Sequence, residues 1–90
     1  MGFRWIAWNA EHIAEHGVSV NEAQFVVTSA GRPYPEYLGD GRYLVRGKTA
    51  AGAYVQVIFI RDPDTDDIFV IHARPLSSSE KRQFRRRRHG

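Results

Sequence analysis

Residues 42–74 carry the pattern that decides the fold: RYLVRGKTAAGAYVQVIFIRDPDTDDIFVIHAR. Three segments within it are predicted β-strands: 42–49, 54–61 and 68–74. Each segment is rich in β-branched and aromatic residues and is bounded by turn-forming residues. The two connections between them are short enough for hairpins, so we expect the strands to pair antiparallel.

Side chains alternate between the two faces of a strand, so the parity of each position predicts two faces for this sheet. One face is apolar and is expected to lie against the core: Tyr43, Val45, Gly47, Val55, Val57, Phe59, Phe69, Ile71 and Ala73. The other, the polar face, holds Arg42, Arg46, Lys48, Gln56, His72 and Arg74, with Leu44, Ile58, Ile60, Ile68 and Val70. Several cations and a histidine on one face suit a phosphate backbone, although Arg and Lys are equally ordinary on a solvated outer face.

Two short helices are predicted before the strands. Asn9 suits the N-cap of a helix that runs to His16, and Gly17 supplies the left-handed residue that ends it. Ser19 and Glu22 have the spacing of a capping box, which predicts a second helix directly after a tight turn.

The rest of the chain is predicted to hold a loop, a C-terminal helix and at most one further strand. The loop spans 31–41, and the apolar stretch 3–8 is either the extra strand, at an edge of the sheet, or a packed N-terminal arm. Residues 77–80 form another capping box and begin a basic helix anchored by Leu76 and Phe84. The sequence therefore predicts an α+β fold, with a small antiparallel sheet of three to four strands, two short N-terminal helices and a C-terminal basic helix.

The composition indicates one domain, 1–90, without cysteine, which excludes disulfides and thiolate metal sites. No signal peptide or spanning helix is predicted, so we expect a cytoplasmic protein with no membrane partner. The net charge of +3 is uneven: residues 1–80 hold seven Lys or Arg and all ten acids, whereas 81–90 hold six cations and no acid. This basic block is either a solvated segment or an arm for RNA or an acidic partner, and its end, 85–90, is either helical or disordered.

One segment of the sequence matches the spacing of a metal-binding motif. His12, Glu15 and His16 match the H-x-x-E-H arrangement of inverted zinc proteases, in which two histidines on one helix face hold zinc. The predicted helix is barely two turns long, and the chain is too short to build a protease cleft. We therefore expect Ile13 to face the core and His16 to pack near the helix end, and we predict no metal site and no cofactor.

Several short segments occur in an order and spacing typical of one toxin family. They are Trp8 with the first helix, His16-Gly17-Val18, Glu22-Ala23, 42–49, Gly52, 55–60, 71–74 and the basic helix from Glu80-Lys81. With these segments the chain from Trp8 onward resembles the BrnT family of type II toxins, members of the RelE/ParE-like toxin group. The resemblance implies a RelE-like fold and an endoribonuclease that cleaves RNA without metal and blocks translation. It also implies a cognate antitoxin from the neighbouring gene, bound in a toxin–antitoxin hetero-oligomer.

The resemblance further implies roles for cations of the polar face. Arg74 matches the family's arginine after the small residue of the last strand and would stabilise transition-state charge. Arg46 and Lys48 lie in the matching middle strand and would orient phosphates. Many members have serine where His72 stands and lysine where Glu15 stands, so His72 inherits no role, although its chemistry suits a general acid or base. The expected catalytic residues are Arg74, His72 and Lys48, and the expected RNA-binding residues are Arg42, Arg46, Lys81, Arg82 and Arg85.

Two alternatives from other classes stay open. The same face would also suit a non-catalytic module that binds RNA, DNA or an acidic partner, with an affinity that falls steeply in salt. Alternatively, the face exists to be covered by another element or chain, because an apolar row is poor surface. That row consists of Ile58, Ile60, Ile68 and Val70.

Overall fold

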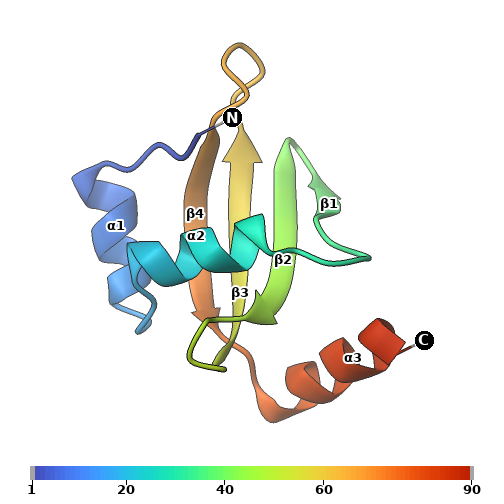
Figure 1. Cartoon of the computed structure of the whole chain (residues 1–90). Helices are drawn as coiled ribbons and strands as arrows, with labels where there is room; N and C mark the ends of the chain where they lie inside the picture. The colour runs from blue at the N-terminus through green and yellow to red at the C-terminus, as the bar shows by residue number, and fades with distance from the viewer. Residues whose placement is uncertain (1, 90) are drawn as a thin grey trace.

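The computed structural model describes residues 2–89, with side chains through Arg87. Its elements follow the order α1 (Ala7–Ala14), α2 (Val20–Thr28), β1 (Glu36–Gly39), β2 (Arg42–Lys48), β3 (Tyr54–Arg61), β4 (Ile68–Pro75) and α3 (Ser78–His89). The strands form one antiparallel sheet in the order β1-β2-β3-β4, with α2 across one face, α1 beside β4 and α3 beyond the strand ends (Figure 1). The predicted α+β class is confirmed. None of the helices within 2–89 has the length and apolar composition needed to cross a bilayer.

The fourth strand, β1, lies in the segment that was predicted as a loop. β1 pairs with the start of β2 across a two-residue turn, in which Asp40 and Gly41 have φ values of 55° and 75°. Positive φ at both positions is what a type I′ hairpin turn requires, and Asp-Gly is a preferred sequence for it. The N-terminal apolar stretch makes an isolated bridge between Phe3 and Ile68 and is not the extra strand.

The start of α1 differs from the prediction, because Asn9 is not its N-cap. The N-cap is Ile6, whose backbone N–H donates to the Asn9 side-chain oxygen at 2.8 Å. The Asn9 amide nitrogen donates to the carbonyl oxygens of Arg4 (3.2 Å) and Val70 (3.1 Å), and the side chain is fully buried. Asn9 therefore ties the start of α1 to the edge strand β4.

The other two predicted helix starts are confirmed. The Glu22 N–H donates to Ser19 Oγ at 3.1 Å, and the Ser19 N–H donates to Glu22 Oε1 at 2.9 Å. The Glu80 N–H donates to Ser77 Oγ at 3.2 Å, and the Ser77 N–H donates to Glu80 Oε1 at 2.8 Å. Each capping box satisfies two N–H groups that would otherwise lack a helical partner.

The core lies between the sheet and the helices α1 and α2, and its burial is what holds these short elements together. Its buried apolar residues include Ile13, Val18, Ala23, Val26, Val45, Val55, Val57, Phe59, Ile68, Val70 and Ala73. The predictions that Ile13 faces the core and that Leu76 and Phe84 anchor α3 are confirmed, since all three are buried.

A β-bulge in β4 reverses part of the predicted face assignment. Ile58 of β3 pairs with His72 and the next residue, Phe59, pairs with Val70, so Ile71 of β4 has no partner in β3. One extra residue changes the side-chain parity of everything before it. Ile68 and Val70 are consequently buried in the core, while Phe69 and Ile71 are half-buried, opposite to the prediction. The polar face thereby loses Ile68 and Val70 of its predicted apolar row and gains Phe69 beside Ile60.

Candidate functional site

The polar face is the sheet face turned away from α2, and the strand register orders its side chains into rows. The rows are Lys48 with Tyr54, Arg46 with Gln56 and Arg74, Leu44 with Ile58 and His72, and Arg42 with Ile60 and Phe69. The predicted cations of β2 and β4 therefore share one face. Their surroundings differ from row to row, and these differences separate structural cations from candidate binding groups.

Arg74 and Arg46 both bind the carboxylate of Glu80. Arg74 donates to the two carboxylate oxygens through Nη1 and Nη2, at 2.8 Å each, and Arg46 Nη2 donates to Oε2 at 3.3 Å. The Arg74 hydrogen bonds, followed by that of the Ser77 backbone, hold the pKa of Glu80 far below its ordinary value of 4.5. Since bidentate pairs are strong, an RNA phosphate would have to compete with Glu80 for Arg74.

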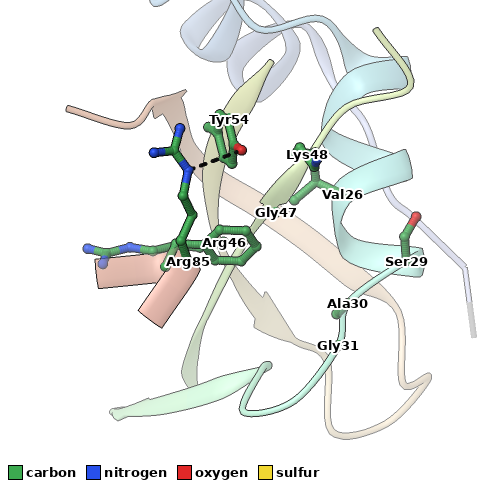
Figure 2. Close-up of a pocket in the computed structure, with 10 residues that line it drawn as sticks. Val26, Ser29, Ala30, Gly31, Arg46, Gly47, Lys48, Tyr54 and Arg85 are labelled. Carbon is green, nitrogen blue, oxygen red and sulfur yellow. Dashed lines mark hydrogen bonds between the residues drawn. The ribbon is translucent and has the colours of Figure 1, made fainter. Parts of the chain in front are cut away.

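A cavity of about 470 Å³ opens between the end of α2, the strands β2 and β3, and α3 (Figure 2). It lies at the part of β2 that extends beyond its pairing with β1, which reaches only to Leu44. Its polar and aromatic lining comprises Arg46, Lys48, Tyr54, Phe84 and Arg85, and Val26 of α2 and the following residues Ser29, Ala30 and Gly31 line the other side. No histidine or carboxylate of the described residues lines it.

Tyr54 stands at this cavity and is surrounded by cations. Lys48 Nζ, Lys81 Nζ and Arg85 Cζ lie 5.6, 5.8 and 5.3 Å from the centre of its ring, within cation–π range. Arg85 Nε also donates to Tyr54 Oη at 3.5 Å, the contact dashed in Figure 2. This hydrogen bond is the main cause that lowers the pKa of Tyr54 from 10.0, and the charges of Arg85, Lys48 and Lys81 act in the same direction.

The cations around Tyr54 differ from Arg46 and Arg74 in their pairing within the described structure. Among the described residues, Lys48, Lys81 and Arg85 form no ion pair, whereas Arg46 and Arg74 share Glu80. Positive charges that are held together without acidic partners create a local potential that attracts anions. This trio is therefore the best candidate for a phosphate-binding group.

The remaining predicted RNA-binding residues lie elsewhere. Arg42 is at the far end of β2, where its Nε donates to the Gly39 carbonyl at 3.4 Å. Arg82 lines a separate hollow on α3 together with Arg85 and Arg86. The structure thus gathers Arg46, Lys48, Lys81 and Arg85 at or beside the cavity, and it leaves Arg42, Arg82, His72 and Arg74 outside its lining.

His72 lies beside two histidines of the α1 end. The centre of its ring is 6.4 Å from that of His12 and 5.6 Å from that of His16. Partial burial, followed by the nearby charges of His16, Arg74 and His12, lowers the pKa of His72 from 6.5. The H-x-x-E-H motif in the sequence includes only His12 and His16, because nothing in the sequence indicates that β4, which carries His72, runs beside α1.

Tyr54 is the site residue that the sequence analysis missed. A signal for it was available: the predicted hairpin between β2 and β3 places Tyr54 directly opposite Lys48, and the structure has this pair. Lys81 and Arg85 carried a weaker signal, since residues four apart share a helix face. Their position over Tyr54 follows only from the docking of α3.

Comparison of the chain with protein-family models, with curated proteins and with solved structures found no match. The resemblance to the BrnT family therefore stays a prediction.

Proposed function

We propose that the protein binds single-stranded RNA at the Tyr54 cavity and cleaves it without metal, as an endoribonuclease toxin. The supporting observation is the trio of Lys48, Lys81 and Arg85 around Tyr54, none of which forms an ion pair with a carboxylate of the described residues. Clustered cations for phosphates next to aromatic rings are the groups by which proteins hold single-stranded RNA. The segments that resemble BrnT toxins point to the same activity.

Tyr54 carries the proton transfer in this proposal. Arg85 donates to Tyr54 Oη and lowers the pKa of Tyr54, and in this mechanism the phenolate Oη accepts the proton of a ribose 2′-hydroxyl. The 2′-oxygen attacks the adjacent phosphorus while Lys81 and Arg85 stabilise the charge on the phosphate oxygens. The bond to the 5′-oxygen then breaks, and Lys48 donates a proton to it. The products are a 2′,3′-cyclic phosphate and a 5′-hydroxyl.

Two residues that the sequence predicted as catalytic act differently here. Arg74 binds Glu80, which caps α3, so Arg74 is a positioning residue for Lys81 and Arg85. His72 does not line the cavity and takes no step in this mechanism.

The proposal is tested by incubating a short RNA with the purified protein in excess chelator and analysing the ends of the products. We expect cyclic phosphate ends and no cleavage of the 2′-deoxy substrate. Tyr54→Phe should lower kcat by about 10²- to 10⁴-fold and leave RNA binding nearly unchanged, because only the proton acceptor is lost. Tyr37→Phe, at an exposed position on β1, is the matched control and should cleave as the parent does. Equal cleavage by Tyr54→Phe would contradict the mechanism.

A non-catalytic RNA-binding module is the second candidate. The observation in its favour is that the described lining of the cavity holds no histidine or carboxylate, the commonest proton carriers. In that case the same experiment yields salt-sensitive binding through Lys48, Lys81 and Arg85 and no cyclic phosphate.

The cellular part of the proposal is a cytoplasmic toxin that a cognate antitoxin binds and neutralises. It is based on the resemblance to the BrnT family. Its test is induction of the parent and of Tyr54→Phe in a bacterial host at matched protein levels. We expect growth arrest by the parent alone, relieved by co-expression of the product of the neighbouring gene. Growth arrest by both proteins would show that toxicity does not depend on the Tyr54 hydroxyl.

A further inference from the structure

Three histidines from two distant parts of the chain meet at the edge of the sheet. His12 and His16 come from α1 and the turn after it, and His72 comes from β4. One ring nitrogen of each lies within 4.8 Å of the corresponding nitrogens of the other two. None of the three lines the Tyr54 cavity, so this cluster is a separate feature of the molecule.

The end of α1 holds His16 in place. The Gly17 N–H donates to the Ala14 carbonyl at 3.0 Å, and the Val18 N–H donates to the Ile13 carbonyl at 3.1 Å. With Gly17 at φ +81°, these two bonds form a Schellman motif. Val18 is buried in the core and anchors the turn. His16 therefore sits in a closed turn, four residues after His12 and on the same side of the helix.

The opposite side of the cluster is also restrained. The His12 ring stacks on Trp8, with ring centres 5.4 Å apart and planes 4° apart, and Trp8 stacks on Phe69 of β4. The buried Asn9 amide joins α1 to the Val70 carbonyl. The helix histidines and His72 are thus positioned relative to one another by contacts that do not involve a metal.

The chemistry of the cluster selects a class of ligand. Three imidazole nitrogens and no thiolate suit borderline divalent ions such as Zn²⁺, whereas Mg²⁺ and Ca²⁺ prefer oxygen. With Zn–N bonds of about 2.0–2.1 Å in a tetrahedron, ligand nitrogens lie about 3.3 Å apart, so small side-chain rotations bring these rings into range. The positive charge of Arg74, two residues after His72, is paired with Glu80.

We propose that His12, His16 and His72 form a Zn²⁺ site that links α1 to β4 and leaves the fourth coordination position open to solvent. Packing of aromatic rings alone explains the stack on Trp8, but it does not require three ring nitrogens to converge. This proposal is independent of the proposed function.

The test is calorimetric titration of chelator-treated full-length protein with ZnCl2. We expect one equivalent of Zn²⁺ per chain and a higher Tm in its presence, with no change caused by Mg²⁺. His12→Ala, His16→Ala and His72→Ala should each weaken binding at least about 10-fold, because each removes one of three ligands. Asn21→Ala, at an exposed position on α2, is the control and should bind as the parent does.

A second measurement reports the location of the metal without altering a ligand. Ni²⁺, which imidazole also binds, should quench the fluorescence of Trp8, since this ring lies against His12. Trp8→Phe should lose most of the quenching, whereas Trp5→Phe should keep it. Absence of stoichiometric Zn²⁺ binding by the parent, or equal binding by folded His72→Ala, would overturn the proposal.

Discussion

At the scale of single residues, Glu80 connects three parts of the molecule. Its carboxylate accepts hydrogen bonds from the Ser77 N–H at the start of α3, from Arg74 of β4 and from Arg46 of β2. The side chain is 18% exposed, so these contacts are partly shielded from solvent. Because β2, β4 and α3 meet at this carboxylate, it helps to hold Lys81 and Arg85 over Tyr54.

Glu80→Gln is expected to lower the free energy of unfolding by about 1–2 kcal/mol at neutral pH. The folded-state pKa of Glu80 lies below its ordinary value of 4.5, so its stabilisation is complete above that value and is lost as the pH falls below it. The difference between parent and variant in urea unfolding should therefore shrink between about pH 5 and about pH 3.

The matched control is Glu22→Gln, which alters the other capping box, where the glutamate has no arginine partner in the described structure. Its effect at neutral pH should be smaller than that of Glu80→Gln. An equal loss in both variants would show that the arginine pairs add nothing to the cap.

At the scale of elements, α1 is held at β4 by a buried amide as well as by apolar packing. The Asn9 side chain uses its oxygen for the Ile6 N–H and its nitrogen for two carbonyl oxygens. Burial of such a group is favourable only because every partner is satisfied.

Asn9→Ala should destabilise the fold by about 2–3 kcal/mol, because it leaves the Ile6 N–H and the Val70 carbonyl without these partners. Asn21→Ala, an exposed position on α2, is the control and should change stability little. The urea midpoint of each variant measures the difference. Equal midpoints would mean that water replaces the amide at no cost.

The element-level predictions from sequence succeeded where the signal was local. The capping boxes at Ser19 and Ser77 involve residues three apart, so the helix starts were predictable. The bulge at Ile71 was not, because it depends on how β4 aligns with β3. The contact of Asn9 with the Val70 carbonyl was not predictable for a similar reason, since the two residues are distant in the chain.

At the scale of the whole molecule, charge is divided between the body and α3. The first eighty residues hold all ten acids, whereas the last ten hold six cations. α3 is not detached: Arg87 pairs with Glu36 at 2.8 Å, and Phe84 is buried between Tyr34 and Tyr54. The described part of the predicted tail therefore lies along the body as helix through His89, and Gly90 is outside the described residues.

Removal of Lys81 and Arg85 together should flatten the salt dependence of RNA binding. Each lost contact to a single-stranded phosphate lowers the slope of log K against log salt by about 0.7. Arg61→Ala, beside Asp66 at the opposite end of the sheet, is the control and should keep the parental slope. Fluorescence anisotropy with a labelled oligonucleotide at several salt concentrations measures both. A double variant with the parental slope would place the RNA elsewhere.

The sequence alone determined the α+β class, the three main strands, the capping boxes and the basic end, because these depend on alternation and on residues a few positions apart. Only the tertiary structure decided which of the described cations form ion pairs, since Arg74 binds Glu80 while Lys48, Lys81 and Arg85 surround Tyr54. It also decided that His72 joins His12 and His16. Both outcomes depend on the docking of α3 and α1, which packing and long-range hydrogen bonds control and local sequence patterns do not encode.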